Sequence, residues 1–339
     1  MLPELRKDPL SGRWVILAPQ RATRPQDLGT ARDVPVLARC PFCPGGEIGT
    51  PAEVLAVRDV GSIANGPGWR VRVVPNKYPA VVEMPDKQTA VVAMFHSSSN
   101  SHLPTQPGRG VHEVIIESPR HLYTNTQQTP DELAEVVWVY RERLRALSQN
   151  REWQYGLIFK NVGFAAGASL EHLHSQLITL PIVPSAIQET LKLTAEFHHQ
   201  RGACYYCDLI ANEVADGTRI VAENERFVAL CPYAGRFAFE TWIIPKRHNA
   251  AFSQADDSEL HELSPMLMDV LRKLEVGLDN PAYNYAIRTT PFDRQNAEHY
   301  HWHIEIFPRV TRLAGFELST DFYINVVRPE DAAALLRKT

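Results

Sequence analysis

Residues 171–180 read EHLHSQLITL, and this stretch decides which fold the sequence predicts. His172, His174 and Gln176 occupy alternate positions, and alternate side chains of a β-strand point to one face of its sheet. We therefore expect a strand that presents two imidazoles and one amide side by side. A similar row stands near the other end of the chain: His299, His301, His303 and Glu305.

The composition is that of an ordinary globular protein. The 339 residues carry a net charge of −4, with 44% hydrophobic and 22% charged residues, which suits about two domains and gives no overall basic field for nucleic acid. The N-terminus lacks the apolar segment of a signal peptide, and no apolar run is long enough for a membrane span. We therefore expect a cytoplasmic protein without a nucleic-acid or membrane partner, whose cysteines serve as thiols or metal ligands.

Two C-x-x-C pairs, Cys40–Cys43 and Cys204–Cys207, prompt a search for an internal duplication. Each pair is followed by an apolar run that ends in a histidine, His121 in HEVIIESPRH and His248 in ETWIIPKRH. After each histidine come a helix start, a further strand and one of the two histidine rows. The four features therefore occur twice in the same order.

The elements between these features can be predicted from caps and spacing. Helix starts are expected at Thr129, which opens a capping box, and at the equivalent Asp256. Strands are expected at 154–160 and 283–288, and an insertion enlarges the first copy around residues 59–69 and 96–110. The sequence therefore predicts an α+β fold with antiparallel sheets. The sequence also predicts that the chain is an internal duplication, in which two halves, residues 1–190 and 191–339, are related by a pseudo-two-fold axis.

Each half offers two cysteines and two histidines, a donor set that suits tetrahedral Zn²⁺. The predicted ligands are Cys40, Cys43, His121 and His172 in the first half, and Cys204, Cys207, His248 and His301 in the second. Four protein ligands leave no open position, so both sites are expected to be structural. In the second half the choice of His301 over its neighbours rests on the repeat register. Glu189 or Glu196 could compete there, and the metal could be zinc or iron.

If His172 faces a metal, His174 is the next imidazole on that face and is available as a nucleophile. A neutral imidazole can attack the α-phosphorus of a nucleotide and form a nucleotidyl-imidazole. Gln176 cannot protonate a leaving group, but its amide can donate to a phosphoryl oxygen. This favours transfer between two phosphates over hydrolysis. Glu305, at the position of Gln176, would repel such an oxygen, so we expect the second half to keep a metal without the chemistry.

These motifs resemble a known family. His-x-His-x-Gln after GASLE, with C-x-x-C far upstream, resembles the galactose-1-phosphate uridylyltransferase branch of the histidine-triad superfamily. The segments RKDPLSGRWVILAPQRATRP, NKYP and GFELSTDFYIN extend the resemblance over nearly the whole chain. It implies histidine-triad-like halves, a ping-pong double displacement through a nucleotidyl-His174, and an active site assembled across a homodimer.

The resemblance also implies further substrate-binding residues. They are Asn161 and Ser169 at the phosphates, Arg21 and Arg24 on the nucleotide side, Asn76, Lys77 and Tyr78 at the base and ribose, and Phe316 and Glu317 at the sugar. On charge alone, Lys160 could join the two arginines in balancing a pyrophosphate. Gly163 and Gly167 leave room for backbone beside a phosphate.

Two departures from the family pattern bear on the substrate. Leu173 stands where the well-known uridylyltransferases have proline, and Ser175 replaces a glycine; NKYP replaces an Asn-Asp-aromatic segment. Both features resemble the branch that includes ADP-glucose phosphorylase. Our main expectation is uridylyl transfer from UDP-glucose to a hexose-1-phosphate, as in galactose metabolism. The alternative is an ADP-glucose phosphorylase that transfers AMP to phosphate, and the other classes are a histidine-triad nucleotide hydrolase and a zinc-stabilised nucleotide-binding protein.

Overall fold

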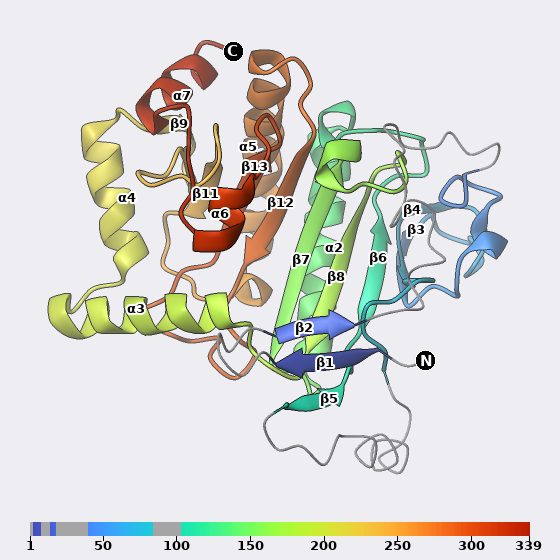
Figure 1. The fold of residues 1–339 in the computed structure, drawn as a ribbon. Coiled ribbons are helices and arrows are strands. Elements are labelled where there is room, and N and C mark those ends of the chain that lie inside the picture. The colour runs from blue at the N-terminus through green and yellow to red at the C-terminus, as the bar shows by residue number, and fades with distance from the viewer. Residues whose placement is uncertain (1–2, 8–13, 18–39, 84–102) are drawn as a thin grey trace.

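The computed structural model describes residues 3–7, 14–17, 40–83 and 103–339, and the structural statements below concern these residues. Ten strands form one large sheet in which every neighbouring pair is antiparallel (Figure 1). In spatial order the strands are β3 (Leu55–Arg58), β4 (Trp69–Pro75), β6 (His112–Ile116), β8 (His174–Leu180), β7 (Tyr155–Val162), β12 (Tyr283–Arg288), β13 (His303–Pro308), β11 (Thr241–Pro245), β10 (Phe227–Leu230) and β9 (Ile220–Glu223). A small sheet contains β2 (Trp14–Leu17), β1 (Glu4–Lys7) and β5 (Thr105–Pro107).

The large sheet shows the duplication directly. Its first five strands come from the first half of the chain, and its last five repeat the same sequence of elements outward from the centre. At the centre β7 pairs with β12, which is the equivalent strand of the second half. The predicted α+β fold with antiparallel strands and two related halves is therefore confirmed, while the division between residues 190 and 191 stays a prediction.

The helices follow the predicted caps. Thr129 caps α2 (Pro130–Ser148) and Asp256 caps α5 (Asp257–Gly277), each with a reciprocal capping box that satisfies exposed N–H groups at the helix start. Figure 1 shows both helices packed on one face of the sheet. The other helices are α3 (Ser185–Arg201), α4 (Tyr205–Asp216), α6 (Gly315–Thr320) and α7 (Pro329–Leu336).

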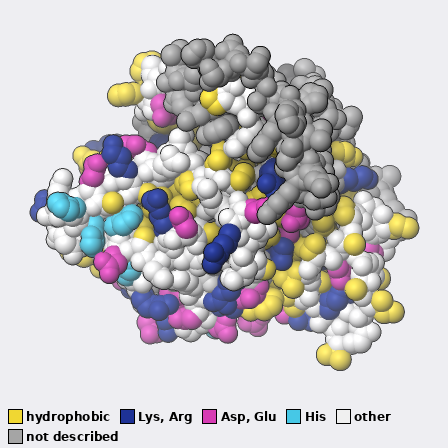
Figure 2. Space-filling view, turned by 90° about the horizontal axis from the view of Figure 1, so that it is seen from below, with side chains coloured by type: hydrophobic (Ala, Val, Ile, Leu, Met, Phe, Trp, Pro, Cys, Tyr) yellow, Lys and Arg dark blue, Asp and Glu magenta, His cyan; other side chains and the backbone are white. Residues whose placement is uncertain are grey.

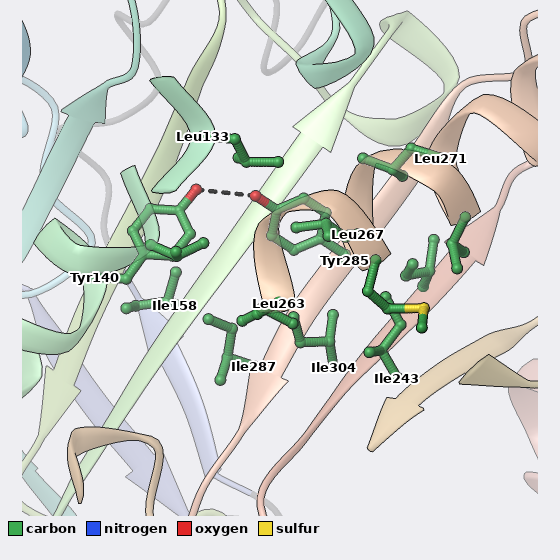
Figure 3. Packing of buried hydrophobic residues seen from close by; sticks show 14 of the residues in the cluster. Leu133, Tyr140, Ile158, Ile243, Leu263, Leu267, Leu271, Tyr285, Ile287 and Ile304 are labelled. Atoms are coloured by element: carbon green, nitrogen blue, oxygen red, sulfur yellow. Dashed lines mark hydrogen bonds between the residues drawn. The ribbon is translucent and has the colours of Figure 1, made fainter. Parts of the chain in front are cut away.

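The main core lies between α2, α5 and the central strands. Figure 3 shows leucines of α5 packed against isoleucines of β12, β13 and β11, with Tyr140 of α2 pointing toward Tyr285 of β12. The two phenol oxygens are 2.9 Å apart and fully buried, so these polar atoms of the core are paired with each other. One continuous core thus holds both halves on a common scaffold.

The opposite face of the sheet carries the candidate site. A second apolar cluster packs Ile187 and Leu191 of α3 and Tyr206 of α4 over the strands of the second half. A third packs Phe42 against Trp69 and other side chains of the first half.

One face of the molecule, seen in Figure 2, carries side chains of both charges. On the face in Figure 2, Lys and Arg side chains alternate with Asp and Glu. None of the described helices is both long and apolar enough to cross a bilayer.

Candidate active site and metal centres

The first Cys/His group gathers residues from three separate segments. Cys40 and Cys43 lie in the turn that precedes the first-half sheet, His121 follows β6, and His172 lies just before β8; their ligand atoms all fall within 4.8 Å of one another. The Nδ1 of His172 is 3.5 Å from the sulfur of Cys40 and 3.5 Å from the sulfur of Cys43. The Nδ1 of His121 is 3.3 Å from the sulfur of Cys43. The Nε2–H of His172 donates to the Ser118 carbonyl at 2.8 Å, so the lone pair of Nδ1 faces the thiols.

This geometry fits a tetrahedral ion. Bonds of the length that zinc makes to sulfur and nitrogen place these atoms about 3.6 Å apart across a tetrahedral angle, close to the observed 3.3–3.5 Å. Gly46 makes the turn possible, because an added Cβ would lie 2.7 Å from the Cys40 carbonyl oxygen and 2.9 Å from that of Cys43. The predicted grouping of the four first-half residues is therefore confirmed.

The second group repeats the arrangement. Cys204 and Cys207 lie at the start of α4, and the sulfur of Cys207 is 3.5 Å from Nδ1 of His248 and 3.7 Å from Nδ1 of His301. The ligand atoms of these four predicted residues lie within 4.8 Å of one another. His299 instead meets the Thr194 hydroxyl at 3.1 Å through its Nδ1. The histidine that the repeat register selected is therefore the one that lies in the group, and the described group includes neither Glu189 nor Glu196.

His174 begins β8 and is buried on the same side of the sheet as the first group, 8% exposed. Its Nδ1 lies 2.7 Å from the carbonyl oxygen of His172. Because a carbonyl can only accept, Nδ1 carries the proton and Nε2 keeps its lone pair. The ring of Phe42 meets the imidazole edge-on with centroids 5.3 Å apart. The backbone thus holds His174 in the tautomer that a nitrogen nucleophile requires.

Gln176 follows on the same face and is held by two neighbours. Its Oε1 lies 2.9 Å from Nε2 of His112 on β6 and 3.4 Å from the amide nitrogen of Asn76. The Oδ1 of Asn76 accepts the backbone N–H of Tyr78 at 2.8 Å. The structure therefore brings the NKYP segment and the amide of Gln176 together. His112 does not stand out in the sequence, because it is one of two polar residues that open the strand HEVII.

Asn161 approaches His174 from the neighbouring strand. Lys160 pairs with Ser175 in the β7–β8 register, so the next residue on each strand, Asn161 and His174, are neighbours, and both line one small cavity. The Oδ1 of Asn161 accepts from Nδ2 of Asn284 on β12 at 2.7 Å. Asn161 thus offers its amide N–H groups to the site.

Asn284 is itself held by groups from both halves. Its Nδ2 also donates to the Ala166 carbonyl at 2.8 Å, and its Oδ1 accepts from Nε of Arg309 at 2.5 Å. Ala166 belongs to the loop between Gly163 and Gly167, both of which have positive φ. The expected phosphate loop is therefore tied to a residue of the second half.

The expectation for Lys160 is wrong. Its side chain is fully buried on the helix side of the sheet and forms an ion pair with Glu117, which also accepts from Ser175 and Tyr140. Burial alone would raise the pKa of Glu117, but the Lys160 charge and these hydrogen bonds hold it below its usual value. Lys160 therefore neutralises a buried carboxylate beneath β8 and has no charge to offer a pyrophosphate.

The second half fills the equivalent position with other groups. His303 contacts the rings of Tyr206 and Trp242, with centroids 4.9 and 5.1 Å away. Glu305 is ion-paired with Arg288 at 2.8 Å and with Arg236 at 3.2 Å. Burial alone would raise the pKa of Glu305, but the His303 hydrogen bond and the Arg288 charge hold it at about 2. The face that would hold a substrate is occupied by aromatic rings and an internal ion cluster.

The other predicted residues fall into three groups. Arg21 and Arg24 lie outside the described residues. Lys77 is exposed on the NKYP segment, and Ser169 lies in the loop before β8. Phe316 and Glu317 lie on α6, whose following segment is tied to the second half through Asn325 and the carbonyl of Phe237. No described contact joins these two residues to β8.

Comparisons with known proteins match the whole chain. A family model described as galactose-1-phosphate uridyl transferase, N-terminal domain, matches residues 1–184. A second model, described as a domain of unknown function (DUF4921), matches residues 103–338. The chain is 35% identical to ADP-glucose phosphorylase from Arabidopsis thaliana, across 99% of this chain and 93% of that protein. It is 28% identical to galactose-1-phosphate uridylyltransferase from Thermotoga maritima, across 99% of this chain and 98% of that protein.

Solved structures agree with the sequence matches. A crystal structure of ADP-glucose phosphorylase from Arabidopsis thaliana with bound ADP-glucose is 34% identical over 99% of both chains, with a TM-score of 0.76. A uridylyltransferase structure matches with a TM-score of 0.80 and 25% identity, over 99% of this chain and 97% of that one. Over its whole length, then, the chain belongs to the galactose-1-phosphate uridylyltransferase family.

Proposed function

We propose that this nucleotidyltransferase takes AMP from an ADP-sugar and passes it to inorganic phosphate, by way of a nucleotidyl-His174. The observation that carries the choice is the 35% identity with ADP-glucose phosphorylase across nearly all of both chains, against 28% with a galactose-1-phosphate uridylyltransferase. The departures at Leu173, Ser175 and NKYP support the same branch. This reverses the order of our two sequence-based expectations.

The site geometry supports a first displacement at His174. The lone pair on Nε2 of His174 attacks the phosphorus that bears the nucleoside. A P–N bond forms and the P–O bond to the sugar phosphate breaks, so the sugar-1-phosphate leaves with both electrons of that bond. A phosphate leaving group needs no general acid, which fits a neutral Gln176 at the third position. The amide N–H groups of Gln176 and Asn161 lie where they can donate to the phosphoryl oxygens.

The second displacement reverses the first with a new acceptor. An oxygen of inorganic phosphate attacks the phosphorus of the nucleotidyl-histidine, the P–N bond breaks, and ADP forms while His174 regains its lone pair. Water would compete for the same intermediate, so a slow rate without acceptor distinguishes the transferase from a hydrolase.

We further propose that both Cys/His groups hold structural Zn²⁺, with iron as the alternative in the second. The support is the donor set, the sulfur–nitrogen distances and the orientation of His172 by Ser118. A bound ion would clamp the turn of Cys40 and Cys43 to the lead-in of β8 and so fix the start of the catalytic strand.

A homodimer and a cytoplasmic location complete the proposal. Exposed apolar side chains follow one another along α6 and the segment after it, among them Phe316, Leu318 and Phe322. Such a run marks a surface that another chain covers, and α6 of one protomer would then reach the partner's site.

Intact-protein mass spectrometry tests the reaction. The protein is mixed separately with ADP-glucose and UDP-glucose without acceptor, beside the His174→Ala variant. We expect an AMP-sized increment from ADP-glucose that is absent from the variant and is removed by phosphate. A UMP-sized increment removed by galactose-1-phosphate would restore the uridylyltransferase alternative, and no increment from either donor would contradict covalent transfer.

A further inference from the structure

We infer that His112 is a positioning residue, which turns the amide of Gln176 so that it presents N–H groups to the phosphoryl oxygen. The same imidazole ties Gln176 to the NKYP segment on the nucleoside side. The inference rests on the proposed function, because it assigns His112 to the His174 site.

The hydrogen bonds of His112 determine its tautomer. The backbone N–H of Ala80 donates to Nδ1 of His112 at 2.9 Å. Since Nδ1 accepts, the ring proton of a neutral imidazole lies on Nε2. Nε2 is 2.9 Å from Oε1 of Gln176 and 3.1 Å from Nδ2 of Asn76. Because an amide nitrogen cannot accept, the Nε2–H donates to the Gln176 oxygen, and the Asn76 amide donates to the same oxygen at 3.4 Å. The side chain is 5% exposed, which leaves water little access to compete for these bonds.

This tautomer fixes the orientation of the Gln176 amide. Its oxygen accepts from His112 and also from the Asn76 amide nitrogen at 3.4 Å. No described residue accepts from Nε2 of Gln176, so these N–H groups remain for a ligand. Rotating the amide by half a turn would bring its NH₂ against two donors and would aim its oxygen at an anionic phosphoryl group. His112 therefore excludes the wrong amide orientation in advance of substrate binding.

His112 also holds the segment that is expected to contact the nucleoside. The backbone N–H of Asn76 donates to the His112 carbonyl at 2.8 Å, and the Ala80 N–H donates to its ring. Residues 76–80 are thus fastened at both ends to one residue of β6. Loss of Nδ1 would release this segment at Ala80, whereas loss of Nε2 would release the amide of Gln176. The two effects can therefore be separated by substitution.

The second half offers an internal comparison. Val114 pairs with Gln176, and Trp242 pairs with Glu305 in the equivalent strands. Counting two residues back in each strand places Glu240 at the position of His112. The half that is expected to lack the chemistry thus has two carboxylates where the active half has an imidazole and an amide. The pair of His112 as donor and Gln176 as acceptor therefore occurs in the half for which we propose an oriented amide.

Two substitutions separate the atoms of the imidazole. His112→Gln can place an N–H near the position of Nε2 but loses the acceptor for Ala80, whereas His112→Asn can keep that acceptor but loses the donor to Gln176. We expect His112→Asn to slow single-turnover formation of the nucleotidyl-enzyme by about 100-fold, as Gln176→Ala does. We expect His112→Gln to recover most of this rate and to show its defect as a raised KM for the nucleotide-sugar.

The His112→Asn, Gln176→Ala double variant tests whether the two residues act as a unit. If His112 acts through Gln176, the double variant is no slower than Gln176→Ala alone. His261→Asn, an exposed histidine of α5, is the matched control and should leave the rate unchanged. Equal rate losses for both His112 variants, or a loss that multiplies with that of Gln176→Ala, would overturn the inference.

A failure of the proposed function would be recognised separately. If the wild-type protein forms no adduct from either nucleotide-sugar, the covalent mechanism is wrong, whatever the variants do. Binding of AMP and UMP, measured by calorimetry, then tests the inference on its own. His112→Asn must weaken binding of one of them as much as Gln176→Ala does; unchanged binding overturns the assignment.

Discussion

His172 and His174 are two residues apart, yet their rings carry the proton on opposite nitrogens. Nε2 of His172 donates to the Ser118 carbonyl, and Nδ1 of His174 donates to the carbonyl of His172. The first ring therefore turns a lone pair toward two thiols, and the second keeps its lone pair on Nε2. At the residue scale, one backbone carbonyl beside each ring separates the proposed metal ligand from the proposed nucleophile.

Glu305 gives a prediction for stability against pH. Its pKa in the folded protein is about 2, below the ordinary value of 4.5. A depressed pKa adds stability that is fully present above the unfolded-state pKa and is lost as the pH falls from about 4.5 toward 2. We expect Glu305→Gln to lower the free energy of unfolding at pH 7 by about 2–3 kcal/mol and to flatten the loss of stability below pH 4.5.

Urea denaturation of wild type and variant at several pH values between 7 and 3 measures this. The difference between the two proteins is the relevant quantity, because every other effect of pH is common to both. If the difference is constant across this range, Glu305 does not have the low pKa on which the prediction rests.

Asn284 supplies a residue-scale prediction for activity. It orients Asn161 and holds the Ala166 carbonyl, and it touches the first half from the second. We expect Asn284→Ala to slow nucleotidyl-enzyme formation about tenfold while the KM for phosphate in the second displacement rises. Ser258→Ala, at an exposed site on α5, is the control. An unchanged rate would show that Asn161 orients itself without this contact.

At the element scale, the turn that carries Cys40 and Cys43 depends on Gly46. A Cβ there would overlap two backbone carbonyl oxygens, and backbone cannot move aside as a flexible side chain can. We expect Gly46→Ala to weaken zinc retention in the first group about 10- to 100-fold. Gly49→Ala is the matched control, because its nearest neighbour is the Pro41 Cβ at 3.4 Å, an ordinary contact.

Zinc release to a chromophoric chelator, with total metal measured by mass spectrometry, reads out the effect. Slow release from one equivalent of metal and fast release from the other is the expected pattern for Gly46→Ala. If both variants release metal alike, the close approach at Gly46 does not constrain the site.

Elements were the level at which the sequence was most informative. Thr129 and Asp256 start their helices as expected, because a cap is a local event between residues three apart. The strand that carries His174 and Gln176 was also predicted, since alternation needs no knowledge of distant neighbours, but His172 lies just before the strand and not in it. The fate of Lys160 could not be predicted in this way. Its face of the strand is set by pairing with Ser175, and its partner Glu117 lies on another segment.

At the scale of the whole molecule, the repeat could be recognised because the two C-x-x-C pairs and the histidines follow one another in the same order in both halves. What the repeat could not reveal is how the second half closes its face. Tyr206 lies between Cys204 and Cys207 in the sequence, and its ring contacts the ring of His303. This contact depends on how α4 packs on the sheet. The two halves therefore share a scaffold and Cys/His groups, while packing decides which half keeps space for a substrate.

The exposed apolar segment predicts the state of assembly. Leu318 and Phe322 are 70% and 74% exposed in the single chain, an arrangement that stabilises the protein only if another surface covers them. We expect wild-type protein to sediment as a dimer at micromolar concentration. Leu318→Glu combined with Phe322→Glu should give monomers that keep their metal and fold, because neither side chain belongs to a core. Val276→Glu, at a site 63% exposed on α5, should remain dimeric.

If α6 completes the partner's site, the monomer also loses turnover, and mixing the monomer with a His174→Ala protein restores part of the turnover. A charged variant that stays dimeric with full turnover would place the interface elsewhere and remove the support for Phe316 and Glu317 as sugar contacts.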